Sequence, residues 1–85
     1  MKTIDLKVSS RRELHDLFEK EFPAPYGRTL DALHDILSTY PEALELVLHS
    51  AELYAALGDR YCDNLMQMLD DTQQENPKLT LRKIE

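Results

Sequence analysis

Residues 44–48 read Leu-Glu-Leu-Val-Leu, and this short apolar run decides how the rest of the chain is interpreted. Its length and composition suit a strand. It follows Pro41, which ends the preceding helical pattern because the residue before a proline is disfavoured in the helical conformation. A strand at this position separates two predicted helices on its N-terminal side from two on its C-terminal side.

The N-terminal half predicts one strand and two helices. Apolar and polar residues alternate over 3–8, which predicts a strand with one buried face. A helix is predicted to begin at Ser10, because Ser10 and Glu13 have the spacing of a capping box. A second helix is predicted from Thr29 as its N-cap. Its expected core stripe is Leu30, Leu33, Leu37 and Tyr40.

The C-terminal half predicts two helices and a final strand. Ser50 is expected to cap a short helix over 51–57 that stops at Gly58. A longer helix follows from about 59 to 75, and residues 79–82 predict the last strand. The expected core stripe of the long helix is Tyr61, Leu65, Met68, Leu69 and Thr72.

The resulting element order is β-α-α-β-α-α-β. Helical pairs between strands form the long crossovers that join parallel strands. The sequence therefore predicts one α/β domain over residues 1–85, with a three-stranded parallel sheet and helices packed on it.

Acidic residues are concentrated in the middle of the chain. The 85 residues carry a net charge of −6, and residues 31–75 carry ten acidic side chains against the single basic Arg60. Phosphate binding needs clustered Lys and Arg, so direct nucleic-acid binding is not expected. Asp5 lies where a signal peptide would be apolar, and no apolar run approaches the ~18 residues of a membrane span. We therefore expect a cytoplasmic protein that does not bind membranes.

The lone Cys62 cannot form an internal disulfide, and no His or Asp arrangement marks it as a nucleophile.

The second predicted helix carries the most specific polar pattern. Asp31, His34, Asp35 and Ser38 lie at i, i+3, i+4 and i+7 and form one continuous stripe. This stripe is either a solvated helix face or a row of acceptors for Arg and Lys of a partner. A third hypothesis is an enzyme or a metal protein. However, active sites are normally concave, whereas this stripe lies on a convex helix, and structural metal sites need about four ligands. No catalytic residue, metal or cofactor is therefore expected. All three histidines, His15, His34 and His49, are expected at the surface.

Residues 26–37 read Tyr-Gly-Arg-Thr-Leu-Asp-Ala-Leu-His-Asp-Ile-Leu, which resembles the barstar family of small acidic intracellular inhibitors of barnase-type ribonucleases. The family pattern is an aromatic-Gly pair, two variable residues, then Leu-Asp-Ala-Leu-Trp-Asp and two apolar residues. This chain departs from it at His34. The resemblance implies a fold of three parallel strands covered by helices. It also implies inhibition by occlusion, in which the second helix and the loop before it enter the ribonuclease cleft and carboxylates replace RNA phosphates.

The resemblance also implies a partner-binding set. Asp35 corresponds to the central carboxylate, Asp31 to its partner one turn earlier, and Asp71 to an acidic residue on the last long helix. Three positions depart from the family, namely Pro25 and His34, where aromatics are usual, and Thr39, where glycine is usual. The full set is Tyr26, Gly27, Asp31, His34, Asp35, Ser38 and Asp71.

Two functions follow from these features. The leading hypothesis is an immunity-type inhibitor of a basic barnase-like ribonuclease, with no enzymatic activity of its own. The alternative is an acidic binding module for another basic partner, such as a nuclease toxin domain or a nucleic-acid-binding regulator.

Overall fold

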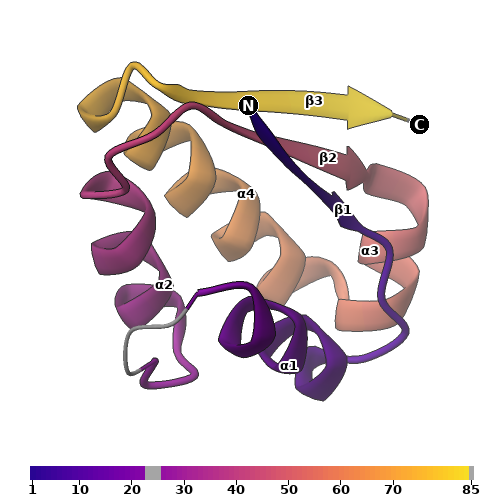
Figure 1. The fold of residues 1–85 in the computed structure, drawn as a ribbon. Coiled ribbons are helices and arrows are strands. Elements are labelled where there is room, and N and C mark those ends of the chain that lie inside the picture. Colours follow the sequence, from indigo (N-terminus) through magenta and orange to yellow (C-terminus); the bar gives the residue numbers. More distant parts are fainter. Residues whose placement is uncertain (23–25, 85) are drawn as a thin grey trace.

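The computed structural model describes residues 1–22 and 26–84. Its elements follow the predicted order (Figure 1). They are β1 (Lys2–Leu6), α1 (Arg11–Glu21), α2 (Leu30–Ser38), β2 (Leu44–His49), α3 (Ser50–Leu57), α4 (Asp59–Glu75) and β3 (Leu79–Ile84). Among the described residues, no helix is long and apolar enough to cross a membrane.

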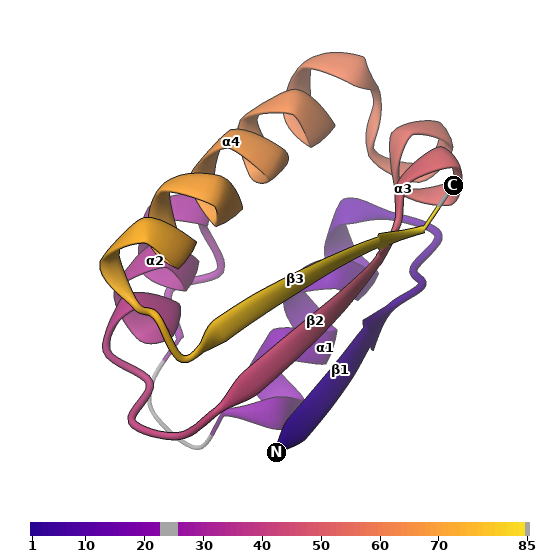
Figure 2. The same ribbon diagram turned by 90° about the horizontal axis from the view of Figure 1, so that it is seen from above.

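The three strands form one parallel sheet, as predicted, with β2 between β1 and β3. Leu46 of β2 lies opposite Ile4 on one side and Leu81 on the other. The helices lie on one face of this sheet (Figure 1), and Figure 2 shows its other face uncovered. On the uncovered face, alternate residues of the two outer strands are polar and exposed, including Thr3 and Arg82, whereas Val47 of the central strand is buried.

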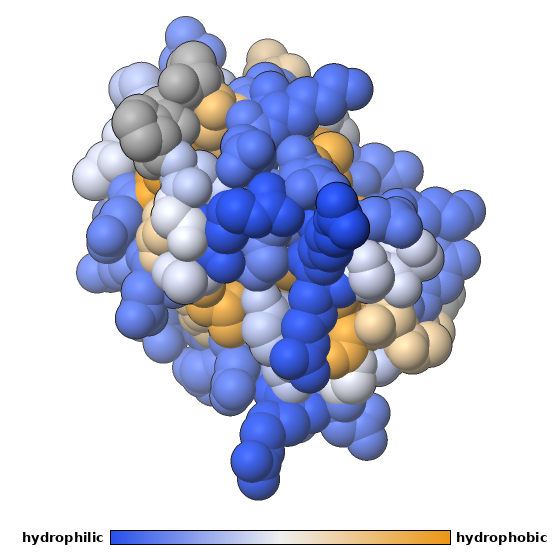
Figure 3. All heavy atoms as spheres, turned by 90° about the horizontal axis from the view of Figure 1, so that it is seen from below, coloured by the Kyte–Doolittle hydropathy of each residue, from blue (hydrophilic) through white to orange (hydrophobic). Residues whose placement is uncertain are grey.

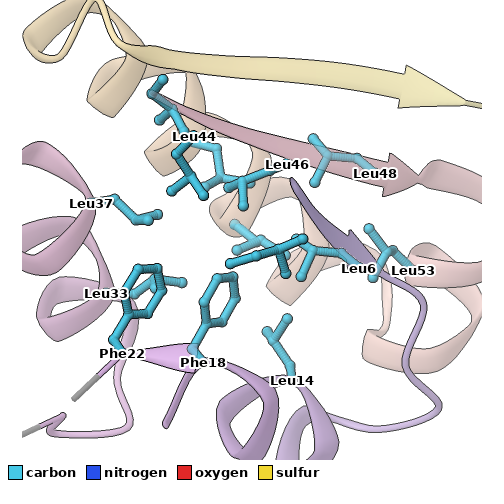
Figure 4. Close-up of a cluster of buried hydrophobic side chains, with 14 of the residues drawn as sticks. Leu6, Leu14, Phe18, Phe22, Leu33, Leu37, Leu44, Leu46, Leu48 and Leu53 are labelled. Atoms are coloured by element: carbon cyan, nitrogen blue, oxygen red, sulfur yellow. The ribbon is translucent and has the colours of Figure 1, made fainter. Parts of the chain in front are cut away.

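The core lies between the covered face of the sheet and the four helices (Figure 4). Leucines dominate it because alternate residues of each strand and one stripe of each helix point inward. Phe18 of α1 is the largest fully buried side chain. The fully buried leucines are Leu6, Leu14, Leu33, Leu37, Leu44, Leu46, Leu48, Leu53, Leu65, Leu69 and Leu79.

The buried stripe of α4 differs from its prediction at two places. Leu65, Leu69 and Thr72 are buried as expected, but Tyr61 and Met68 are half-buried. Cys62 takes the inward position one residue after Tyr61 and is fully buried. Its burial raises the pKa of the thiol.

The predicted N-cap of α1 is confirmed in part, and the predicted N-cap of α2 is confirmed in full. The Ser10 side chain accepts from the backbone N–H of Glu13 at 3.1 Å. The return bond of the capping box goes elsewhere, because the Glu13 carboxylate accepts from the backbone N–H of Ser9 at 3.3 Å. The Thr29 hydroxyl accepts from the N–H of Ala32 at 3.0 Å and so caps α2 as predicted.

Several element ends differ from the sequence prediction, and α2 ends at Ser38, before the predicted stripe residue Tyr40. The prediction that Ser50 caps α3 is wrong, since α3 begins at Ser50 itself and His49 occupies the cap without a side-chain bond. The reason is that strand pairing continues through His49, opposite Ile84, so β2 runs directly into the helix. That pairing also extends β3 beyond residue 82. At the other edge, pairing stops at Leu6, so Val8 lies outside β1.

Candidate partner-binding surface

Helix α2 is fixed to the core and to the end of α4. Leu33 and Leu37 are fully buried on its inward face. Asn76, only 6% exposed, donates from Nδ2 to the carbonyls of Leu37 at 2.9 Å and Tyr40 at 3.1 Å. The Leu37 carbonyl also accepts the backbone N–H of Tyr40 at 3.4 Å, so the two amide bonds tie the end of α2 to the end of α4. The outward face of α2 is therefore presented by a supported helix.

The outward face carries two exposed carboxylates, Asp31 and Asp35, which we call the acidic ridge. Both are exposed, and the Asp35 side chain is 85% exposed. Within residues 1–22 and 26–84, neither has a lysine or arginine nitrogen within 4.0 Å. The spacing of one helical turn places both on the same side of α2.

Elsewhere, one arginine and three lysines pair with other acids. Arg28 pairs with two carboxylates of α1, at 2.7 Å to Asp16 and 3.3 Å to Glu19. The remaining pairs with lysine are Lys2 with Glu21, Lys7 with Glu52, and Lys83 with Asp70. These cations therefore lie apart from the acidic ridge.

His34 lies beside the acidic ridge, but its main partner is on another helix. Its Nε2 contacts the Glu75 carboxylate of α4, and its Nδ1 lies 3.6 Å from Oδ1 of Asp35. The hydrogen bond with Glu75 is the largest cause that raises the pKa of His34, and Asp35 adds to it. Among the described residues, the carboxylates in contact with this imidazole are therefore Glu75 and Asp35, and Asp31 is not one of them.

Glu75 is a residue that the sequence reasoning missed. It lies one turn after Asp71 on the same face of α4, so its contact with His34 brings that face alongside α2. Asp71 is exposed there and accepts from Nε2 of Gln67 at 3.1 Å. A search for acids at i+4 from Asp71 would have found Glu75.

The segment before α2 is anchored by a buried histidine, which corrects the expectation of a surface His15. His15 is 7% exposed and contacts the Tyr26 hydroxyl through Nδ1 and the Tyr61 hydroxyl through Nε2 at 2.7 Å. Burial is the largest cause that lowers the pKa of His15, and the Arg28 charge adds to it. A neutral imidazole can donate to one hydroxyl and accept from the other. The residues that satisfy this buried ring come from distant parts of the chain, so local spacing gave no signal.

The same contacts place the two loop residues of the predicted set. The Tyr26 side chain is mostly buried, at 9% exposure, and its burial raises the pKa of the phenol. Gly27 is exposed, and a Cβ there would meet Cβ of Ala32 at 3.3 Å. Arg28 adopts a φ of 57°, in the left-handed region. The expectation about Pro25 lies outside the described residues.

Ser38 and Thr39 end α2 by bonding to their own helix. The Ser38 hydroxyl donates to the backbone carbonyl of Asp35 at 3.3 Å, and the Thr39 hydroxyl donates to the same oxygen at 2.8 Å. Both side chains therefore close the last turn of α2 on the backbone of Asp35.

No metal centre emerges from the described residues, since no group of three potential ligands among them could hold an ion. The face seen in Figure 3 is mostly hydrophilic, with hydrophobic atoms in small separate areas. On this face, recognition would have to rely largely on polar and charged groups.

Together, the fold and this surface define a small acidic α/β protein with three parallel strands and one helix that presents exposed carboxylates. The chain belongs to the barstar family. The family model described as "Barstar (barnase inhibitor)" matches residues 2–83, which confirms the resemblance noted at residues 26–37. A protein of Bacillus subtilis (strain 168) named "Putative ribonuclease inhibitor YrdF" is 38% identical over 65 residues, which cover 73% of this chain and 71% of that protein.

Proposed function

We propose that this chain inhibits a basic barnase-like ribonuclease inside the cell that makes the enzyme. In this proposal α2 and the segment before it enter the active-site cleft, and Asp31 and Asp35 occupy the places of RNA phosphates. The observation that carries the proposal is the acidic ridge itself: Asp35 is 85% exposed on a supported helix. Membership of a family described by barnase inhibition supports the class of target.

The physical basis is charge-assisted hydrogen bonding with little loss of entropy. Carboxylates bind guanidinium and ammonium groups through short, strong hydrogen bonds. A helix that is already ordered loses less conformational freedom on binding than a loop does. In addition, the net charge of −6 steers the chain toward a basic enzyme at low ionic strength. The partner set then comprises Tyr26, Gly27, Asp31, His34, Asp35, Ser38 and Asp71.

The test compares Asp35→Ala with a charge control, Glu52→Gln. Glu52 lies on α3, at the opposite end of the molecule from α2 in Figure 1, and its side chain is 52% exposed. Truncating one member of a buried charge pair costs about 2–5 kcal/mol, so Asp35→Ala should raise the inhibition constant against barnase by at least about 30-fold. Glu52→Gln should change it only slightly. Circular dichroism should show both variants folded.

Two results bear on the choice between the functions. If Asp35→Ala inhibits as well as the unaltered chain, occlusion by α2 is wrong. If a panel of basic ribonucleases is not inhibited but another basic nuclease domain binds in an Asp35-dependent way, the alternative binding module replaces this proposal.

A further inference from the structure

A shallow groove of about 500 Å³ runs past the C-terminal end of α2. Most of its exposed lining is apolar, and Ile36, Tyr40 and Pro41 contribute to it. Tyr40 is held in place by an edge-to-face contact with Phe22, with ring centroids 5.4 Å apart. The complete lining is Phe22, Asp35, Ile36, Thr39, Tyr40, Pro41 and Glu42.

Two carboxylates are the only ionised groups among these lining residues. Asp35 belongs to the acidic ridge, and Glu42 is exposed. In the part of the chain that the structure describes, Glu42 has no ion pair within 4.0 Å. Lys78 lies nearby, but its Nζ donates to the backbone carbonyl of Pro41 at 2.7 Å and is not part of the lining.

This combination fits one kind of side chain. An arginine has an apolar stem that can lie on apolar surface and a planar guanidinium that binds carboxylates and stacks on aromatic rings. A purely apolar side chain would leave both carboxylates unpaired and would partly desolvate them. Lysine also has an apolar stem, but arginine alone adds a planar group that binds a carboxylate through two parallel hydrogen bonds and stacks on an aromatic ring.

We propose that the groove receives an arginine side chain of the ribonuclease, with its stem against Ile36, Tyr40 and Pro41 and its guanidinium at Glu42. This inference rests on the proposed function, because it takes the partner to be basic and to engage Asp35. It extends the contact surface beyond the acidic ridge, past the end of α2. Glu42 then selects among basic ribonucleases according to whether they carry an arginine at this place.

The first experiment needs no ribonuclease. The ¹⁵N-labelled chain is titrated with N-acetyl-arginine methylamide and, separately, with N-acetyl-citrulline methylamide, a neutral analogue of nearly the same shape. We expect saturable shifts at Ile36, Thr39 and Tyr40 with the arginine compound, and at least about threefold weaker binding after Glu42→Gln. Equal shifts with citrulline, or shifts spread evenly over all acidic segments, would overturn the proposal.

The second experiment asks whether a target uses the groove. With a ribonuclease that the chain inhibits, Glu42→Gln should raise the dissociation rate by about threefold to tenfold, whereas Glu52→Gln should leave it unchanged. If Asp35→Ala abolishes inhibition but Glu42→Gln matches the unaltered chain, the proposed function stands and the arginine site is wrong. If no basic ribonuclease is inhibited, the proposed function fails, and the first experiment still decides whether the groove holds an arginine.

Discussion

Asn76 offers a sharp test of how α2 is held in place. Replacing Asn76 by Asp keeps the shape of the side chain but removes the donor that bonds the carbonyls of Leu37 and Tyr40. The Oδ1 atom of residue 76, which accepts from the backbone N–H of Lys78 at 3.1 Å, is retained in the variant. The substitution therefore removes the two bonds that tie the end of α2 to the end of α4 and puts a charged oxygen in place of their donor.

The expected loss of stability follows from these two bonds. A buried polar group left without a partner costs about 1–3 kcal/mol. The Leu37 carbonyl keeps the N–H of Tyr40 as a partner, and the Tyr40 bond is only half-buried, so the loss is about 1–3 kcal/mol. A negative charge at the C-terminus of α4 opposes the helix dipole and adds to the loss.

The measurement is urea unfolding at pH 7, followed by circular dichroism. The control is Asn64→Asp, at the chain's other asparagine, which is exposed on α4 and makes no side-chain hydrogen bond among the described residues. Both variants carry the same added charge. Asn76→Asp should lower the urea midpoint by at least about 1 M, and Asn64→Asp should hardly move it. Equal midpoints for the two variants would refute the reasoning.

Two further predictions concern the histidines, whose pKa values move in opposite directions. The raised pKa of His34 means that its imidazole becomes charged as pH falls through a value above about 6.5. Binding of a basic partner should therefore be severalfold weaker at pH 6 than at pH 8, and His34→Gln should flatten this profile; an unchanged profile in direct binding measurements would contradict the role of His34. The pKa of His15 is lowered, so the unfolded chain binds its proton first and folding stability should fall as pH drops below about 6.5. The raised pKa of His34 has the opposite effect, because its stabilisation is complete below about pH 6.5 and is lost at higher pH. Urea unfolding between pH 7 and 5 in a His34→Gln background isolates His15, and a flat stability profile there would count against its neutral, buried state.

The element order and the parallel sheet could be predicted because local signals mark them clearly. Gly58 and the Asn76-Pro77 pair delimit α4, and its bounds, Asp59–Glu75, agree with the predicted 59–75. The exposed positions of the acidic ridge likewise followed from helical spacing. These features depend on residues within a few positions of each other.

The contacts that could not be predicted join distant residues. His15 meets Tyr61, 46 positions away, and His34 meets Glu75, 41 positions away. Nothing in the local spacing of a histidine indicates which side chain will face it across two helices. The rotation of α4 that buries Cys62 and leaves Tyr61 half-exposed accompanies the Tyr61 contact with His15. The role of each predicted site residue in binding stays a prediction.

The two faces of α2 have different roles, one in packing and the other at the surface. Leu33 and Leu37 are fully buried, whereas Asp31 and Asp35 point into solvent and contribute little to packing. Changes at the outward positions should therefore cost the domain little stability, since surface substitutions usually stay within about 0.5 kcal/mol. Under the proposed function, a lineage could then retarget such a helix toward a different ribonuclease one exposed residue at a time, without changing the core beneath it.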